Sequence, residues 1–339
     1  MKNLLLLLHR VFNPAPKEFL EQLEKSGFNI DKLIKSGISR RKLEKLNDGS
    51  LKDWILEQKK KAEDNGWKIL TFFDENYPPL LKEISHPPII IFVKGNIELP
   101  CFAIVGTRRA TEYGRSIAFN FARKLSSSGL NIVSGLAHGI DTYAHKGALS
   151  VGKTIAVLGS GGLKIYPSSN RLLAKEIAEN GALVTEFFPD DGPARFRFPL
   201  RNRIIAGLSF GVLVVEAGQK SGAMITARLA LEYGRDIFAI PGDIGRRTSL
   251  GTNLLIQQGA KLVLDVEDII GEYYEEKKVV LTKEEEILLS YIPENESVDA
   301  EFLTEVTSIR PERIFRLLLE LEMKGVIIQT SGWRYRKIG

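Results

Sequence analysis

The densest group of chemically active side chains lies in residues 195–203, which read Arg-Phe-Arg-Phe-Pro-Leu-Arg-Asn-Arg. Four of these nine side chains are guanidinium groups, two are phenylalanines and none is acidic. Guanidinium groups neutralise phosphates, and a phenylalanine ring offers a face on which an unpaired base can stack. The segment therefore favours single-stranded nucleic acid as a ligand. The alternative is a helix whose arginines pair with distant acids and whose phenylalanines belong to the core.

A second candidate for phosphate binding is the turn Gly106-Thr107-Arg108-Arg109, which follows an apolar run and precedes a helical pattern. A strand-to-helix turn leaves the first backbone amides of the helix without intrahelical partners, and an arginine adds positive charge. An anion can therefore bind at this turn. Glycine also occurs at such turns for geometric reasons alone, so the turn by itself identifies no ligand.

Residues 147–154 read Gly-Ala-Leu-Ser-Val-Gly-Lys-Thr and match the pattern of a phosphate-binding loop. That loop needs a strand before it and a helix after it, because helix amides hold the phosphates. Here a helical pattern precedes the loop and an apolar strand pattern follows it, so we reject an ATPase. The glycines at 159–162 lack the last glycine of a dinucleotide fingerprint. No cofactor is predicted.

Groups that could catalyse a reaction or hold a metal are sparse. His138, Asp141 and His145 share one face of a predicted helix. No further ligand cluster accompanies them, so capping and interhelix hydrogen bonds are the favoured interpretation. The serines at the predicted crevice lack the Gly-x-Ser-x-Gly pattern of a nucleophile elbow. The sequence therefore offers no clear set of catalytic residues.

Short apolar runs alternate with helical segments between residues 101 and 268, and this pattern predicts the scaffold for these side chains. Runs that are continuously apolar are typical of strands buried on both faces, so we predict a doubly wound α/β domain with a mainly parallel sheet. Four of the runs end in glycine-bearing segments, and the carboxyl ends of parallel strands meet in one crevice. The predicted strands are 102–105, 131–133, 154–158, 182–185, 212–215, 236–240 and 261–264.

Residues 1–65 show helical spacing of apolar side chains, interrupted by Ser-Gly pairs at 26–27 and 36–37. Two such stops resemble a SAM-like or helix-hairpin-helix module, although a plain helical packing unit fits the same pattern. Paired prolines at 78–79 and 87–88 predict an extended connection, because proline cannot continue a helix. We therefore predict a helical module over 1–65 and a Rossmann-like domain over 66–272.

Helical patterns near 283–291, 299–306 and 311–324, followed by a hairpin-like ending, predict a winged-helix domain over 279–339. This domain contains 8 basic and 11 acidic residues, for a net charge of −3. The rest of the chain contains 39 basic and 31 acidic residues, for a net charge of +8. The excess positive charge therefore lies outside the domain whose shape most suggests DNA.

The composition of the 339-residue chain limits where the protein works. Its net charge of +5 permits a polyanionic partner without identifying one. The single cysteine, Cys101, cannot form an internal disulfide, which favours a reducing compartment and hence the cytoplasm. The leucine run at 4–8 is too short to span a membrane, so we interpret it as core and predict no membrane partner.

The motifs, taken in their order along the chain, closely resemble those of one family. They are Val-Gly-Thr-Arg at 105–108, Ser-Gly-Leu-Ala-His-Gly-Ile-Asp at 134–141, Phe-Pro-Leu-Arg-Asn-Arg-Ile-Ile at 198–205, Ser-Gly-Ala-Met-Ile-Thr-Ala at 221–227, Pro-Gly-Asp at 241–243 and Gly-Thr-Asn-Leu-Leu-Ile at 251–256. This order resembles the DNA-processing protein A family, also called DprA or Smf, over about residues 70–265. A C-terminal winged helix also fits many of its members.

The resemblance implies a non-catalytic cytoplasmic protein with an extended Rossmann fold that binds and protects single-stranded DNA. It also implies a homodimer that helps to load the RecA recombinase during natural transformation. Thr107 stands where the family more often has serine, which keeps a hydroxyl group. By motif, phosphate falls to Gly106, Thr107 and Arg108, the basic pocket to Arg197, Arg201 and Arg203, base stacking to Phe198, and further DNA contacts to Ser134, Gly135, Asn202, Lys220 and Ser221.

Two readings from other functional classes stay open. The first is a nucleotide phosphoribohydrolase of the lysine-decarboxylase-like group, but its Pro-Gly-Gly-x-Gly-Thr-x-x-Glu signature is missing at 216–222. The second is a winged-helix transcription regulator, in which Arg313 and Arg316 would face duplex DNA. Acidic neighbours such as Glu312 and Glu320 would weaken that phosphate attraction.

Overall fold

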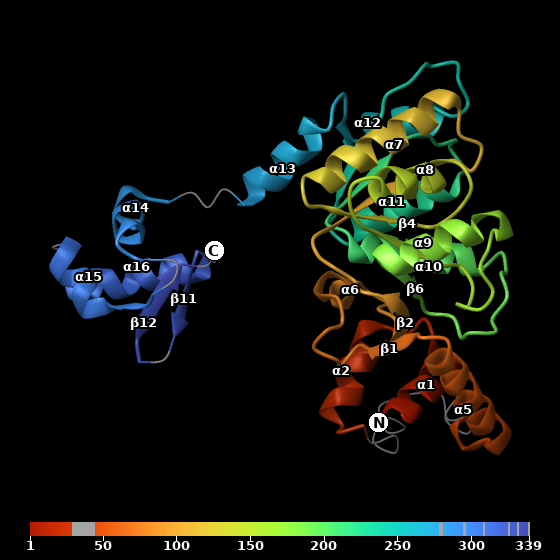
Figure 1. The fold of residues 1–339 in the computed structure, drawn as a ribbon, viewed down its shortest axis with the longest axis horizontal. Coiled ribbons are helices and arrows are strands. Elements are labelled where there is room, and N and C mark those ends of the chain that lie inside the picture. Colours follow the sequence, from red (N-terminus) through yellow and green to blue (C-terminus); the bar gives the residue numbers. More distant parts are fainter. Residues whose placement is uncertain are drawn as a thin grey trace. The chain divides into compact units, whose positions relative to one another are not determined.

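The computed structural model of this chain describes residues 1–28, 45–277, 281–293, 296–307, 309–324, 326–330 and 332–337. The chain forms two compact units, Met1–Ile269 and Ile270–Gly339 (Figure 1). Each unit has its own hydrophobic core, and each is described by itself.

The first unit is built on a nine-stranded sheet with the order β1-β2-β6-β5-β4-β3-β7-β8-β9. Strands β3 to β9 pair in parallel, whereas β2 pairs antiparallel with both β1 and β6. The predicted α/β class with a mainly parallel sheet is confirmed. The strands are β1 (Lys68–Thr71), β2 (Ile90–Gly95), β3 (Cys101–Val105), β4 (Asn131–Ser134), β5 (Thr154–Val157), β6 (Ala182–Thr185), β7 (Gly211–Val214), β8 (Asp236–Ala239) and β9 (Lys261–Leu262).

Six helices connect the parallel strands and cover the sheet. The strand order runs from β3 outward to β6 and then returns to β7 on the other side of β3, so right-handed crossovers place α7–α9 and α10–α12 on opposite faces. The contacts of α7 with α8 and of α10 with α11 fit this division. The order of strands therefore reverses between β3 and β7, which is where α/β sheets bind ligands. The helices are α7 (Glu112–Ser127), α8 (Ile140–Leu149), α9 (Arg171–Asn180), α10 (Arg197–Leu208), α11 (Gly222–Glu232) and α12 (Leu250–Gln257).

The N-terminal helices pack against the β1–β2 side of this sheet. The leucines at 5–8 are buried in α1, and they belong to one core with the strands. No helix in the described ranges is both long and apolar enough to cross a lipid bilayer. The separate module predicted over 1–65 stays a prediction, and its second Ser-Gly stop lies outside the described residues. The helices before β2 are α1 (Lys2–Phe12), α2 (Lys17–Lys25), α5 (Gly49–Asp64) and α6 (Pro79–Glu83).

The two antiparallel strands β1 and β2 are the main difference from the sequence prediction. We expected an extended connection around the paired prolines, and the structure places a strand on each side of it. The prolines at 87–88 end just before β2, so they do not interrupt its hydrogen bonds. The apolar residues at 90–93 form the only continuous run there, and β2 extends the sheet through β6.

In its described residues, the second unit contains most of α13, the helices α14 to α16 and a three-stranded antiparallel sheet with the order β10-β12-β11. The last three helices lie where the sequence predicted them, and the side chains of Leu288, Leu303, Leu317 and Tyr335 meet in its core. The winged-helix assignment itself stays a prediction. Helix α13 (Glu267–Lys277) precedes α14 (Lys283–Ser290), β10 (Val298–Asp299), α15 (Ala300–Thr307), α16 (Pro311–Met323), β11 (Ile327–Thr330) and β12 (Arg334–Lys337).

Candidate nucleic-acid interface

A cleft of about 660 Å³ opens beside the carboxyl ends of β3 and β7. The turn after β3, the cleft-facing side of α10 and the first turn of α11 form most of its lining. Seven of the twelve predicted DNA-binding residues meet there. These are Gly106, Thr107, Arg108, Phe198, Arg201, Asn202 and Ser221.

The turn after β3 is held in place by tight backbone contacts. The Thr107 N–H donates to the Glu216 carbonyl at 2.7 Å, and the Thr107 carbonyl accepts from the Ile140 N–H at 3.2 Å. A Cβ at Gly106 would lie 2.5 Å from Cγ1 of Ile140, so only glycine fits. Gly139 has a φ of +74°, and a Cβ there would lie 2.3 Å from the Thr107 oxygen. These contacts fix the backbone that carries Arg108.

The helix that follows this turn already has an anion at its N-terminus. The buried Glu216 carboxylate accepts from the Thr111 N–H at 2.9 Å and from the Thr111 hydroxyl at 2.6 Å. A Cβ at Gly114 would lie 2.3 Å from Oε2 of Glu216, so the carboxylate sits directly against the first turn of α7. We expected DNA phosphate to use those amides. Because Glu216 occupies that position, phosphate attraction at this turn depends on the arginine side chains.

The first turn of α11 faces the cleft without such a carboxylate. Ser221 stands at the N-cap position of this helix without a side-chain cap hydrogen bond, and Gly222, Ala223 and Thr226 line the cleft beside it. The first turn contains no acid, and Oγ of Ser221 is buried without a hydrogen-bond partner among the described residues. Helix-start amides attract anions. A phosphate group in the cleft can therefore approach α11 more readily than α7.

The Phe198 ring contacts two other side chains at the cleft. The Arg108 guanidinium lies over its ring, 5.0 Å from the centroid, and the Tyr166 ring lies 5.7 Å away at 47°. A Cβ at Gly159 would lie 2.5 Å from Cδ1 of Phe198, so that glycine gives the ring its space. Positive charge and aromatic surface therefore meet at one place, as nucleic-acid stacking sites require.

Arg201 lies deeper than the other arginines and is 4% exposed. Its Nη1 donates to the carbonyls of Gly135 and Val157, at the ends of β4 and β5. Burial lowers the pKa of Arg201 to about 10, the nearby Asp141 carboxylate opposes this shift, and Arg108 adds to it. Arg201 remains charged at neutral pH, and it supports the floor of the cleft from beneath.

Gly135 lies directly against that guanidinium. A Cβ at Gly135 would be 2.2 Å from Nη1 of Arg201, which excludes any larger residue. Gly135 lines a small pocket together with Arg108, Phe198 and His138. Gly135 therefore leaves space for the Arg201 guanidinium at the end of β4.

Two of the predicted arginines do not line the cleft. Nη2 of Arg197 pairs with Oδ1 of Asp191 at 2.6 Å. Arg203 is buried and pairs with Glu186. These two arginines therefore pair with acidic side chains, as the alternative interpretation of the segment expected.

Ser134 and Lys220 also lie outside the cleft. The Ser134 hydroxyl is fully buried and donates to the Ile104 carbonyl at 2.6 Å, because β3 and β4 are neighbours. Lys220 lines an adjoining pocket of about 440 Å³ on the far side of Ser221. The sequence pattern predicted where the strands end. It did not predict which side chains near those ends face the cleft.

Among the cleft residues that were not predicted as contacts, three have side chains that suit nucleic acid. Arg109 and Arg195 are exposed at the cleft, and Tyr166 is 44% exposed beside Phe198. Both arginines belong to the segments that the sequence analysis singled out, 106–109 and 195–203, so the signal for them was available. The position of Tyr166 depends on the path of the segment after β5, and no local pattern predicts that path.

Comparisons with known proteins agree with this site. The family described as DNA recombination-mediator protein A matches residues 68–274. The chain belongs to this family. The DNA processing protein DprA of Streptococcus pneumoniae is 45% identical over 60% of this chain and 73% of its own length. Protein Smf of Escherichia coli is 49% identical over 58% of this chain and 54% of its own length.

Two solved structures of family members resemble this fold. DNA processing protein A from Streptococcus pneumoniae has a TM-score of 0.68 and 35% identity, and the match covers 80% of this chain and 98% of that one. DNA processing protein A from Helicobacter pylori, solved for its single-stranded DNA binding mode, has a TM-score of 0.57 and 33% identity. Its match covers 62% of this chain and 96% of that one.

The other sequence motifs have internal partners in this family member. His145 is buried beside the Thr154 hydroxyl, with Nδ1 at 2.8 Å, and Oδ2 of Asp141 accepts from the Gly135 N–H at 3.1 Å. Burial lowers the pKa of His145 to about 3 and raises that of Asp141. Within the described ranges, no three His, Cys, Asp or Glu side chains are grouped so that they could hold a metal ion.

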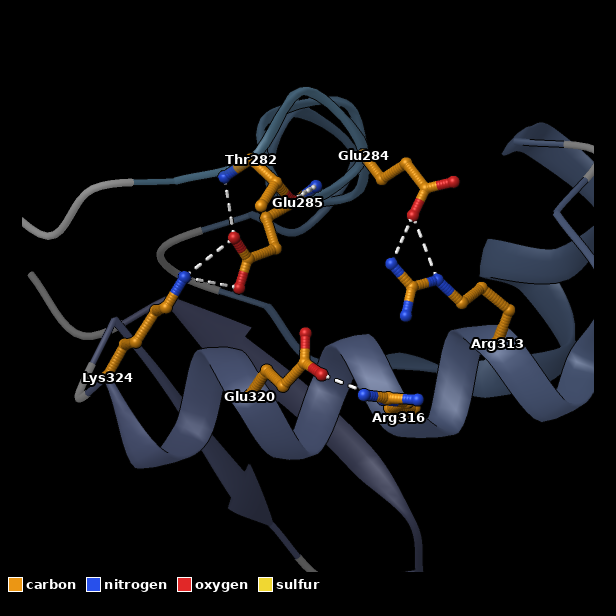
Figure 2. A network of polar contacts seen from close by, with 7 residues as sticks. All are labelled: Thr282, Glu284, Glu285, Arg313, Arg316, Glu320 and Lys324. Carbon is orange, nitrogen blue, oxygen red and sulfur yellow. Dashed lines mark hydrogen bonds and ion pairs between the residues drawn. The ribbon is translucent and has the colours of Figure 1, made fainter.

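The arginines of α16 are also paired with acids, as Figure 2 shows. Nη2 of Arg313 lies 2.5 Å from Oε2 of Glu284, and Nε of Arg316 lies 2.9 Å from Oε1 of Glu320. Nζ of Lys324 contacts both Glu285 oxygens, at 2.6 and 2.7 Å. The helix that would read duplex DNA in a transcription regulator therefore has its cations engaged within the unit.

Proposed function

We propose that this chain binds and protects single-stranded DNA in natural transformation and recombination. The observation that carries this proposal is the contact of the Phe198 ring with the Arg108 guanidinium and the Tyr166 ring in the cleft at the ends of β3 and β7. Membership of the recombination-mediator family and the single-stranded DNA binding described for the Helicobacter pylori relative support it.

Different groups in the cleft serve the backbone and the bases of the strand. Arg108, Arg109 and Arg195 are exposed and attract phosphates, together with the helix-start amides of α11. The rings of Phe198 and Tyr166 accept an unpaired base by stacking, which a base within a duplex cannot offer. The cleft therefore favours single strands and discriminates little between sequences.

Binding without catalysis is part of this proposal. The carboxylates nearest the cleft hold backbone groups, since Glu216 bonds to Thr111 and Asp141 bonds to Gly135. Both carboxylates therefore have a structural role in holding the backbone around the cleft. In this proposal the chain acts by binding DNA, and it uses no cofactor.

The partners and the setting complete the proposal. The family's description as a recombination mediator supports transfer of the bound strand to a recombinase, which we assign to RecA. We further propose that the chain works as a homodimer in the cytoplasm. A dimer brings two clefts to one strand, and the second bound site raises the effective affinity.

A titration of the full chain with single-stranded and double-stranded oligonucleotides of equal length tests the proposal. At two salt concentrations, the affinity for single strands should exceed that for duplex and should fall steeply as salt rises. Oligonucleotides of different base composition should bind with similar affinity. Equal or tighter binding of duplex would overturn the proposal.

A further inference from the structure

A buried polar cluster joins the N-terminal segment to α10, the helix that carries Phe198. It consists of His9, Asn13, Glu186 and Arg203, which we call the Glu186 cluster. Arg203 forms an ion pair with Glu186 and donates to Oδ1 of Asn13 at 3.2 Å. Asn13 donates to the same Glu186 carboxylate, and Nε2 of His9 lies 2.6 Å from the Glu186 carbonyl oxygen. Residues far apart in the sequence therefore meet at one carboxylate.

The Glu186 cluster holds the side of α10 that faces away from the cleft. Phe198 and Asn202 line the cleft, whereas Arg203 does not. A hydrogen-bonded helix moves largely as one body, so a change at Arg203 is transmitted to Phe198. Both groups of the ion pair are also hydrogen-bonded to Asn13, and these bonds fix the orientation of the two side chains. The cluster can therefore set the direction in which α10 presents the ring.

Stability alone does not account for this cluster. Glu186 and Arg203 are 1% and 4% exposed. Among the described residues, Oε1 of Glu186 and both Nε and Nη1 of Arg203 have no hydrogen-bond partner. Burial lowers the pKa of His9 to about 3, so that ring is neutral and the ion pair holds the only charges of the cluster. Buried pairs with unsatisfied atoms contribute little net stability, whereas they can fix one arrangement.

We propose that Asn13, Glu186 and Arg203 are positioning residues that orient Phe198 against the Arg108 guanidinium. Through them the N-terminal segment sets how well the cleft binds a single strand. This inference rests on the proposed function. It assigns the N-terminal helix a part in DNA binding without any contact between that helix and the strand.

The test compares Asn13→Ala with Gln58→Ala in the full chain. Gln58 also joins the N-terminal region to the segment after β6, but both of these hydrogen bonds, of 2.8 and 3.1 Å, go to Asp190 and not to a residue of α10. Each variant carries 4-fluorophenylalanine at position 198, so that the ¹⁹F chemical shift reports the surroundings of the ring. Single-stranded oligonucleotide affinity and its salt dependence are measured on the same samples, after thermal melting has shown that each is folded.

Asn13→Ala should move the ¹⁹F resonance and weaken single-strand binding by about three- to tenfold, with the salt slope unchanged because no phosphate contact is lost. Gln58→Ala should leave both the resonance and the affinity as in the unsubstituted chain. An Asn13→Ala resonance or affinity equal to that of the unsubstituted chain overturns the inference, as does an equal effect of Gln58→Ala. If the unsubstituted chain binds no single strands, the proposed function fails, and the resonance alone decides the positioning role.

Discussion

Arg108 and Phe198 were predicted as separate contacts, one for phosphate and one for a base, but the structure places them in contact with each other. The guanidinium lies 5.0 Å from the ring centroid, so it covers a face on which a base would stack. A strand that draws Arg108 to a phosphate would uncover that face. Charge recognition and stacking are therefore linked, and the two side chains should not act independently.

This link predicts non-additive effects of Arg108→Ala and Phe198→Ala. Arg108→Ala should weaken single-strand binding and lower the salt slope by about one counterion. Phe198→Ala should cost about 1–3 kcal/mol of binding free energy at an unchanged slope. Because binding breaks the contact between the two side chains, each single variant also removes that cost, so the double variant should lose more than the sum by at least about 0.5 kcal/mol. Fluorescence titrations of the three variants measure this, and strict additivity would show that the contact does not matter for binding.

Among the other arginines, the pairing pattern predicts a contrast between Arg195 and Arg197. Arg195 is exposed at the cleft, whereas Arg197 pairs with Asp191 at 2.6 Å. Arg195→Ala should lower the salt slope by about one, because a phosphate contact is lost. Arg197→Ala should leave the slope unchanged. Titration over a range of salt concentrations decides this, and the opposite order would restore the role that the sequence suggested for Arg197.

Burial of His145 predicts a pH dependence of stability. Its pKa is lowered to about 3 in the folded state, so the stability it contributes is complete above the unfolded pKa of about 6.5 and is lost as pH falls towards 3. In that window the free energy of unfolding should fall by about 1.4 kcal/mol per pH unit from this residue. Urea denaturation of the unsubstituted chain and of His145→Gln between pH 7 and pH 4.5 measures the difference in slope. These pH values cover about half of the window, which is enough to detect the difference. Parallel curves would contradict the assignment.

At the scale of elements, the apolar runs predicted all seven parallel strands to within two residues at either end. Such runs are reliable because a strand covered on both faces must be apolar throughout. The side chains at the ends of those strands were harder to place. Glu216 follows β7 and reaches the start of α7 from 105 residues away, and Glu186 follows β6 and pairs with Arg203 in α10. No local pattern identifies such a partner.

The order of elements around β5 predicts that Lys153 has no part in DNA binding. Helix α8 precedes the Gly152-Lys153-Thr154 segment and β5 follows it, so this segment lies at the start of the strand. Nζ of Lys153 pairs with Oε1 of Glu98 at 2.6 Å. Lys153→Ala should therefore bind single strands as the unsubstituted chain does, with Arg108→Ala as the weakened reference. A loss as large as that of Arg108→Ala would contradict this topology-based interpretation.

At the scale of the whole molecule, the cores and the charges of the two units differ. The cleft lies wholly in the first unit, and the core of the second unit is separate. The second set of helical patterns predicted a separate domain over 279–339. The sequence analysis missed β1 and β2, although the continuous apolar run at 89–93 is a strand signal for β2. The N-terminal helices and the sheet share one hydrophobic core.

The last prediction concerns the C-terminal residues, whose net charge of −3 contrasts with +8 for the rest of the chain. In α16, Arg313 and Arg316 are paired with Glu284 and Glu320, so these cations have less to offer phosphates. Deleting residues 279–339 should therefore weaken single-strand binding far less than Arg108→Ala does. The melting transition of the first unit should survive, because its core is separate.

Binding titrations and thermal melts of the deleted chain and of Arg108→Ala provide the comparison. Since the deleted residues carry net negative charge, the salt slope should stay the same or rise slightly, because repulsion of the strand is removed. A slope that falls by several counterions would mean that the wing cations Arg334, Arg336 and Lys337 contact DNA. That outcome would move part of the interface into the second unit.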